Sequence, residues 1–542
     1  MEYKNKNQVK TLKEFIALSL DDVHPKLDGK YPGIDEAITL FLSWVTKKKK
    51  IAVFGDYDVD GDGALAIATL LMRSLRLTAE IVSPGRFSNG YGITSKAIED
   101  LHQKGINALI TVDNGIAALE PLKLAKNYGM EIIVLDHHEP VIKDGEVILP
   151  EADVLVDPHV TGGRNGFDDL CGAGLMYFFA TGVLKRVGIL DEVTREKMIV
   201  FAALSTVADV VKLQSDNRAI VTEGLRLIRE DKMTEGLREL IRGVGIDLST
   251  FDEGTIGYSI GPCLNASGRL SDKGPEKMVQ LLTCETASEA TSSLVEKAIL
   301  CNEKRKEIVA DMMNMASMYL LATDDDNSRF LVYHHQGDPK KHEGVAGIAA
   351  AQLAEKYHKP CIVLCGSGTV KGSGRTFLTA DVLGSLRKID QDLLISYGGH
   401  PEACGVKLLE SNIPAFRAAM QKVTPKVDMP EELLYDFDIE ADAAEAFATE
   451  QQEYAPFGAG NPKPLVRMRL HVVKVFFMGD AKQHVKFLTK EGISVLQFDG
   501  AKALKGKKPE WIKTVDAVGT LGFNTYMGKT TLQLEAKSFA VK

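Results

Sequence analysis

Short apolar runs alternate with longer stretches of helical periodicity through residues 51–156. Continuous apolar strands that alternate with helices are typical of a parallel sheet covered on both faces. In such a sheet, ligands bind beyond the carboxyl ends of the strands. The pattern therefore predicts an α/β domain whose site lies just after these runs. The predicted strands are residues 51–54, 80–83, 108–112, 131–135 and 152–156.

Acids occupy every second position after the first predicted strand. If the backbone stays extended there, Asp56, Asp58 and Asp60 project to the same side. Carboxylates crowded on one face repel each other unless cations lie between them. Two glycines then allow a tight turn into a helix over residues 64–72. Such hard oxygen ligands suit magnesium or manganese, and the alternative interpretation is a solvated acidic turn.

Residues with metal-ligand chemistry also follow two later strands. Asp113 ends one of them, although Asp-Asn-Gly can equally be a turn. His137 and His138 end another, and because neighbours on an extended chain face opposite ways, at most one binds the same ion. The other is then a candidate to contact a substrate phosphate or to act as an acid. Asp209 interrupts the apolar segment 201–213, where a buried acid needs a metal or a helix-capping role.

Four of these segments resemble the motifs of DHH phosphoesterases. They are Gly55–Gly61, Val112–Ile116, Leu135–His138 and Val207–Val210. Five further segments resemble the RecJ branch of that family, the single-strand-specific exonucleases. These are Pro84–Gly92, Leu264–Leu270, Lys371–Thr376, Tyr397–Gly405 and Pro456–Pro462. The matches occur in the expected order along the chain, so the resemblance is specific.

The resemblance implies a centre of two Mn²⁺ or Mg²⁺ ions. Its ligands would be Asp58, Asp60, Asp113, His137 and Asp209, with Asp56 as a further ligand or close support. Phosphodiester hydrolysis must deliver hydroxide to a charged phosphate and stabilise the departing alkoxide, and two cations do both. The family also implies a catalytic group of His138, Asp136 and Arg269, in which Asp136 orients its histidine neighbours. The implied substrate-binding residues are Arg86, Tyr91, Ser373, Arg375 and His400, with the arginines and Ser373 at the 5′ phosphate.

The chain departs from the family pattern in small ways. Asp62 adds an acid just after residues 55–61, which we call the acidic elbow, and is expected to affect ion preference. Asp157 precedes a proline where the family usually has asparagine, so we do not count it as a ligand.

The remaining pattern predicts five segments. Residues 1–50 form a helical lead-in, 51–284 the DHH catalytic domain, 285–322 a connecting helix and 323–428 a smaller α/β DHH-associated domain. Short strands from residue 429 to 542 predict an OB-fold-like barrel that binds nucleic acid. Its basic and aromatic candidates are Lys502, Lys505, Lys507, Lys508, Lys529, Phe487, Phe498 and Trp511. The alternative is a solvated basic loop beside a barrel core. The predicted fold class is thus α/β with a C-terminal OB-like β-barrel.

Composition narrows the setting. The 542 residues are 45% apolar with a net charge of −9, and no apolar run approaches the ~20 residues of a membrane span. An acidic chain counts mildly against a nucleic-acid partner, although bound divalent ions would offset part of the charge. Seven cysteines without paired spacing favour a reducing cytoplasm over a disulfide framework. We expect a cytoplasmic monomer with no membrane partner.

The predicted function is a metal-dependent 5′→3′ exonuclease that degrades single-stranded DNA to mononucleotides in DNA repair or recombination. A single-strand-binding protein is a candidate partner. One alternative is a DHH-family phosphodiesterase acting on short oligonucleotides or cyclic dinucleotides, which would not need a third domain. Another is a nuclease-dead single-strand-binding scaffold, in which an intact acidic cluster would contribute only repulsion.

Overall fold

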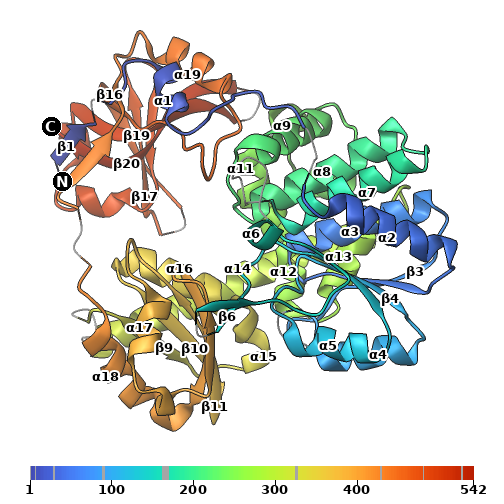
Figure 1. The fold of residues 1–542 in the computed structure, drawn as a ribbon. Helices are drawn as coiled ribbons and strands as arrows, with labels where there is room; N and C mark the ends of the chain where they lie inside the picture. Colours follow the sequence, from blue (N-terminus) through green and yellow to red (C-terminus); the bar gives the residue numbers. More distant parts are fainter. Residues whose placement is uncertain are drawn as a thin grey trace.

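The computed structural model describes residues 2–6, 8–27, 31–87, 92–143, 145–161, 170–323, 328–427, 430–479, 481–526 and 529–542. This part of the chain forms three bodies (Figure 1): a large α/β domain, a smaller α/β domain beyond a long helix, and a mainly β domain. None of the helices described is both long and apolar enough to span a bilayer.

The first body is built on a five-stranded parallel sheet in the order β3-β2-β4-β5-β8. Helices α4 and α5 cover one face, and α2, α3 and α7 cover the other. Both faces of the central strands are therefore buried, as their continuous apolar runs predict. The elements are α2 (Ile34–Thr46), β2 (Ile51–Phe54), α3 (Val59–Ser74), β3 (Ala79–Val82), α4 (Ser95–Gln103), β4 (Ala108–Val112), α5 (Leu119–Asn127), β5 (Glu131–Leu135), β8 (Val154–Val156) and α7 (Gly172–Arg186).

A helical layer completes this body. It contains α8 (Glu192–Ala208), α9 (Ser215–Arg229), α10 (Glu235–Gly243), α12 (Gly261–Leu270) and α13 (Gly274–Leu282). A π-helix, η2 (Ile256–Ile260), leads directly into α12. Shorter elements are the hairpin β6 (Val141–Lys143) and β7 (Glu146–Ile148), α6 (Pro158–Thr161) and α11 (Glu253–Thr255).

The long helix α14 (Glu289–Thr323) runs from the first body into the second. The second body has a mixed sheet in the order β12-β13-β11-β10-β9. Helices α14 and α16 pack on one face, and α17 and α18 pack on the other. Its elements are β9 (Leu331–His335), α15 (Pro339–His342), α16 (Ala346–Tyr357), β10 (Cys361–Ser367), β11 (Thr369–Arg375), α17 (Val382–Lys388), β12 (Ser396–Gly399), β13 (Ala403–Leu409) and α18 (Ile413–Val423).

The third body is a six-stranded sheet that closes on itself through pairing of β16 with β19. The predicted fold class is therefore confirmed. Of the aromatic candidates for nucleic-acid stacking, Phe487 is fully buried, so its prediction is wrong: it fills the barrel core. Phe498 and Trp511 are 54% and 67% exposed. The elements are β15 (Phe437–Asp438), α19 (Ala444–Gln452), β16 (Val466–Met478), β17 (His484–Thr489), β18 (Ser494–Gln497), β19 (Thr514–Tyr526) and β20 (Lys529–Val541).

The first fifty residues do not form one helical lead-in. Strand β1 (Glu2–Asn5) pairs in parallel with β14 (Glu432–Tyr435), and α1 (Leu12–Ala17) buries its apolar side in the core of the third body. By contrast, α2 packs into the first body through Phe41 and Trp44. The strand was missed because Glu2–Asn5 has only polar residues around one tyrosine, which is no signal for a buried strand.

One arginine of the first body holds two distant segments against it. Arg218 on α9 is fully buried, and its guanidinium donates to the carbonyl of Val23 at 2.7 Å and to those of Tyr454, Ala455 and Pro456 at 2.9 to 3.0 Å. Five donors in a fixed fork suit such a set of converging carbonyls. The Arg218 contacts with residues 454–456, which lead into the Pro456–Pro462 motif, thus form a clasp between the first and third bodies.

Replacing Arg218 with leucine should weaken the association of the first and third bodies and lower the free energy of unfolding of the protein by about 3 kcal/mol. The variant leaves four buried carbonyls without their charged donor, and the measurement is a urea denaturation followed by tryptophan fluorescence. Arg226→Leu on the same helix is the matched control. Arg226 pairs with Glu223 and Glu230 at the surface, where such contacts contribute less than about 1 kcal/mol. Equal shifts of the two unfolding midpoints would contradict the clasp.

Candidate metal centre and phosphate site

The acidic elbow is a helix start, not an extended strand. Strand β2 ends at Phe54, and Asp58 is the N-cap of α3. Its Oδ1 atom accepts hydrogen bonds from the amides of Asp60 and Gly61 at 3.0 and 3.2 Å. The predicted alternation of Asp56, Asp58 and Asp60 along an extended chain is therefore wrong. The reason is local: a carboxylate placed before free helical amides satisfies them and starts the helix early.

A glycine brings the helix start against the preceding chain. A Cβ atom at Gly61 would lie 2.5 Å from both the carbonyl carbon and the oxygen of Asp56. The first turn of α3 therefore packs directly on the Asp56 backbone, which no larger residue permits. This contact folds the elbow tightly. As a result, one carboxylate oxygen each from Asp56, Asp58 and Asp113 lie within 4.8 Å of one another.

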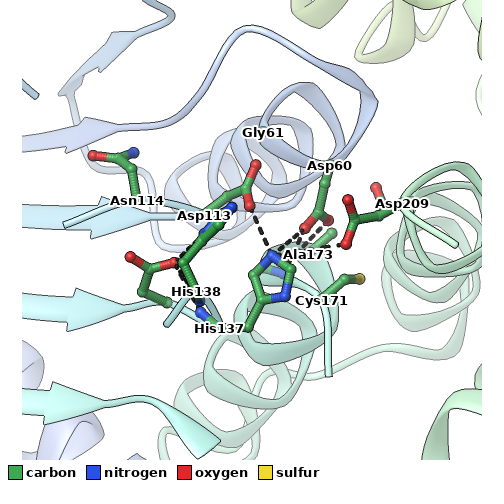
Figure 2. A network of polar contacts seen from close by, with 12 residues as sticks. Asp60, Gly61, Asp113, Asn114, His137, His138, Cys171, Ala173 and Asp209 are labelled. Carbon is green, nitrogen blue, oxygen red and sulfur yellow. Dashed lines mark hydrogen bonds and ion pairs between the residues drawn. The ribbon is translucent and has the colours of Figure 1, made fainter. Parts of the chain in front are cut away.

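Asp60 is held by the start of another helix. Its two carboxylate oxygens accept from the amides of Gly172 and Ala173 at 2.6 and 2.9 Å (Figure 2). The positive end of α7 stabilises the charge of this buried acid. A Cβ atom at Gly172 would lie 2.5 Å from the Asp113 Cβ, so the first turn of α7 packs directly against Asp113 as well as binding Asp60. Sequence reasoning missed these amides; the one available signal was the pair of glycines at 172 and 174 before an apolar helix.

The His137 ring lies close to the carboxylates of three acids. Its Nε2 atom lies 3.1 Å from Asp113 Oδ1, 3.5 Å from Asp60 Oδ2 and 3.8 Å from Asp209 Oδ2 (Figure 2). Burial, followed by the charge of His138, lowers the pKa of His137, which keeps the ring neutral as a metal ligand must be. Asp60, His137 and Asp209 form one group with ligand atoms close enough for a single ion.

Asp209 is not the buried acid that its apolar surroundings in the sequence predict. Helix α8 ends at Ala208, Asp209 is its C-cap, and its side chain is 31% exposed. The following residue, Val210, has a φ of +59° that turns the chain away from the helix. The acid thus lies at a helix end facing the centre, with access to solvent.

The backbone at Asp113 is strained. Its φ of +60° lies in the left-handed region, which aspartate tolerates better than most residues but still at a cost. Asn114 anchors the turn, because its Nδ2 atom donates to the carbonyls of Val112 and Phe54 at 2.9 and 3.3 Å. The ends of β2 and β4 are thereby tied together just below the acids.

His138 and Asp136 form a separate pair. Asp136 is fully buried and accepts from His138 Nδ1 at 2.8 Å, and from the amides of Ile116 and His137 at 2.9 and 2.8 Å. Burial alone would raise the pKa of Asp136, but these hydrogen bonds and the charges of the two histidines lower it to about 2. Burial would lower the pKa of His138, yet the hydrogen bond and charge of Asp136 raise it to about 9. Asp136 therefore favours the protonated form of His138.

The centre has the electrostatics of a cation site. Burial, and then repulsion from Asp58, raises the pKa of Asp56 well above its ordinary value. Burial and the charge of Asp60 do the same for the pKa of Asp113. The Oδ1 atom of Asp56 is buried and has no hydrogen-bond donor among the described residues. Unpaired buried carboxylates are costly unless cations bind them. The residues therefore fit divalent metal ions with oxygen ligands and one imidazole.

Arginines line the side of the centre that faces the second body. The Arg86 guanidinium lies 3.9 Å above the Tyr57 ring, and Arg269 donates to the Gly344 carbonyl at 3.1 Å. Arg375 donates to Ser373 Oγ at 3.0 Å, beside the first turn of α16. Burial, and then the charges of Arg86, Arg305 and Arg375, lowers the pKa of Arg269 to about 10 despite the nearby Asp58. None of Arg86, Arg269 and Arg375 has an ion pair with a described carboxylate.

Two predicted substrate residues are not placed at this site. Tyr91 lies outside the described residues. His400 is exposed in the turn between β12 and β13, and its side chain has no hydrogen bond or ion pair within the described ranges. Their roles stay predictions. Asp62 lies fully buried in the first turn of α3, where burial and then Asp58 raise its pKa, and it belongs to none of the ligand groups found among the described residues.

The sheet, the acid–histidine cluster at its edge and the second domain beyond α14 are those of a DHH protein. A family model for the DHH family, N-terminal domain, matches residues 50–206, and one for the DHHA1 domain matches residues 327–425. A third model, for the RecJ OB domain, matches residues 435–538. The chain is 30% identical to the single-stranded-DNA-specific exonuclease RecJ of Salmonella typhimurium, over 93% of this chain and 89% of that protein. The chain belongs to the RecJ family.

Two further comparisons agree with this membership. The chain is 30% identical to the RecJ exonuclease of Bacillus subtilis over 94% of its own length, and the match spans 63% of that longer relative. The crystal structure of RecJ in complex with Mn²⁺ from Thermus thermophilus superposes with a TM-score of 0.80 at 26% identity. That match covers 96% of this chain and 73% of the other.

Proposed function

We propose that the protein is a metal-dependent exonuclease that hydrolyses single-stranded DNA from the 5′ end to mononucleotides, in DNA repair or recombination. The observation that carries the proposal is the position of the acid–histidine cluster beside arginines that lack described carboxylate partners. Acids hold divalent cations, and arginine forks bind phosphate. Relatives named as single-stranded-DNA-specific exonucleases support this proposal.

The ion ligands in this proposal are Asp56, Asp58, Asp60, Asp113, His137 and Asp209. Mn²⁺ or Mg²⁺, when bound, supplies Lewis-acid stabilisation of the phosphoryl oxygens and an acidified water. Carboxylate oxygens with a single imidazole favour these ions over zinc. The ligands come from four separate segments, and α7 and the Asp58 cap fix two of them before any ion arrives.

The protein's own groups orient the substrate. His138, held by Asp136, presents a positive N–H group to the scissile phosphate or to the departing oxygen. Arg269 binds the same phosphate, while Arg86, Ser373 and Arg375 bind the terminal 5′ phosphate. This terminal site combines Arg86 of the first body with Ser373 and Arg375 of the second. A strand whose terminal phosphate is bound there, with its next phosphate at the acids, is cut one nucleotide from its 5′ end. His400 and Tyr91 complete the proposed substrate contacts.

The third body is proposed to bind the strand beyond the cut. Lys508 lies 4.5 Å from the ring centre of the exposed Trp511, and Lys474 lies 4.7 Å from that of Phe476. Exposed aromatic rings next to lysines suit base stacking and backbone contacts.

We further propose that the protein acts as a monomer in the cytoplasm and is recruited by a single-strand-binding protein. All seven cysteines are free, which suits a reducing compartment.

The test uses one strand with either a 5′ or a 3′ label, incubated with Mn²⁺. We expect labelled mononucleotide as the first product of the 5′-labelled strand and stepwise shortening of the 3′-labelled strand, with little cleavage of a duplex. A 5′-phosphorylated dinucleotide is tested in parallel. Turnover of the dinucleotide without degradation of the long strand would favour a small-substrate phosphodiesterase. Binding of the long strand without turnover of either substrate would favour a nuclease-dead scaffold.

A further inference from the structure

A cavity of about 220 Å³ lies beside the metal centre, where the first body meets the second. Its walls include Ala208, which precedes Asp209, together with Asn265 and Arg269 of α12 and Arg305 of α14. Helix α16 of the second body closes the far side. The volume is many times the ~10–15 Å³ that one water occupies on this scale. The cavity therefore has room for a larger polar group.

Arg305 is the second arginine in the wall of this cavity, and no described carboxylate neutralises it. Its Nε and Nη2 groups donate to Asn302 Oδ1 at 3.0 and 2.9 Å, one turn earlier on α14. This contact fixes the guanidinium plane and leaves Nη1 without an acceptor among the described residues. The side chain is half-buried and pairs with no described carboxylate. A partly desolvated guanidinium in a polar cavity is a binding group for an anion.

The neighbouring arginines indicate where this anion lies along the strand. Arg269 and Arg305 both line the cavity, whereas Arg86 and Arg375 do not. Arg269 also donates to the carbonyl of Gly344, which lies beside Phe87 and three residues before the Gly347 turn that contacts Arg375. Arg269 therefore lies between Arg305 on one side and the Arg86–Arg375 group on the other. In the proposed function, the terminal phosphate binds the Arg86–Arg375 group and the scissile phosphate faces Arg269. The next phosphate in the 3′ direction would then lie at Arg305.

We propose that Arg305, with Asn265 and the cavity around them, binds the internucleotide phosphate immediately 3′ of the scissile phosphate. The inference rests on the proposed exonuclease function and specifies its substrate register: three consecutive phosphates have three separate arginine sites. The strand is thus held on both sides of the bond that breaks. After each mononucleotide leaves, the phosphate at Arg305 becomes the next scissile phosphate.

The experiment compares two short substrates, the 5′-phosphorylated dinucleotide and trinucleotide of thymidine. Only the trinucleotide has a phosphate 3′ of the scissile one. We expect Arg305→Ala to lower the ratio of the two kcat/KM values, trinucleotide over dinucleotide, by about tenfold, which is the effect of one charge-assisted hydrogen bond. Arg305→Lys should lower the ratio less, because it keeps the charge but not the planar fork. Lys304→Ala, an exposed neighbour on α14, should leave the ratio unchanged.

A neutral linkage tests the same contact from the side of the substrate. A trinucleotide with a methylphosphonate at its second linkage should lose about tenfold in kcat/KM with the parent enzyme, and little with Arg305→Ala, because the contact is then already absent. Equal losses with both enzymes, or an unchanged substrate ratio in Arg305→Ala, would overturn the assignment of Arg305. If the parent hydrolysed neither substrate while folded and supplied with Mn²⁺, the exonuclease function itself would fall, and this inference with it.

Discussion

Asp113→Asn is expected to lower kcat/KM on single-stranded DNA by about 1,000-fold or more while the protein stays folded. The Asp113 carboxylate approaches Asp56 and Asp58 on one side, and its Oδ1 atom lies 3.1 Å from His137 Nε2 on the other. The amide removes a negative charge shared by the whole centre. Losing the resulting stabilisation of the phosphoryl group costs several kcal/mol, or about three powers of ten in rate. Asparagine accepts the left-handed backbone at this position, so the turn survives.

The measurement is steady-state hydrolysis of a labelled strand, paired with calorimetric titration of Mn²⁺, which the variant should bind at least about tenfold more weakly. Asp157→Asn is the matched control. Asp157 also follows a strand of the sheet and is fully buried, but its Oδ1 atom accepts from the His159 amide at 2.9 Å and it belongs to none of the ligand groups described. Near-parent activity in Asp113→Asn, or equal losses in the two variants, would contradict the proposed centre.

His138→Gln is expected to lower kcat by about 100- to 10,000-fold, with a smaller change in KM. Asp136 keeps the imidazole charged and fixes which nitrogen faces the substrate, since Nδ1 is engaged at 2.8 Å. Glutamine offers a hydrogen-bond donor of similar reach, but it has neither the positive charge nor a proton acidic enough to transfer. The substitution therefore removes stabilisation of the transition state more than it weakens binding of the substrate.

Single-turnover kinetics with saturating enzyme separate the chemical step from binding in this variant. Asp136→Asn should show a loss of about 10- to 100-fold, because it disturbs the orientation of His138 without removing it. His334→Gln provides the control: His334 is the penultimate residue of β9, in the second body, and contacts the Gly366 carbonyl at 2.9 Å. A kcat of His138→Gln as high as that of His334→Gln would exclude a role for His138 in the chemistry.

Much of the architecture was predictable because strands and helices leave a periodic apolar pattern in the local sequence. The runs 108–112 and 131–135 are observed as β4 and β5 with the same bounds. Continuous burial of such strands leaves a strong apolar signal. Strand β1 had no such signal, because its partner lies near residue 433 and its side chains face solvent on one side. Phe487 was misjudged for a related reason: residue type alone does not tell which face of a barrel strand is inside.

The site was predictable in its members more than in its geometry. Strand ends that carry Asp113 and His137 converge at one edge in any parallel sheet, and the motifs that resemble the DHH family supplied the rest. The path of the chain between them was not predictable. Capping by Asp58 depends on free amides that exist only once α3 forms, and the support of Asp60 comes from residues 172 and 173, more than a hundred positions away. Asp209 was expected to be buried because the sequence does not show where α8 ends.

The pairing of β1 with β14 has a consequence for how the chain is made. A ribosome adds about 5–20 residues per second, so Glu2–Asn5 leaves it roughly 20–90 s before Glu432–Tyr435. During that interval the apolar side of α1, with Leu12, Phe15 and Ile16, has no core to enter. A nascent chain halted near residue 425 would hold both α/β bodies and still expose this helix. Translation arrested at that point should therefore yield a product that chaperones bind through its first twenty residues.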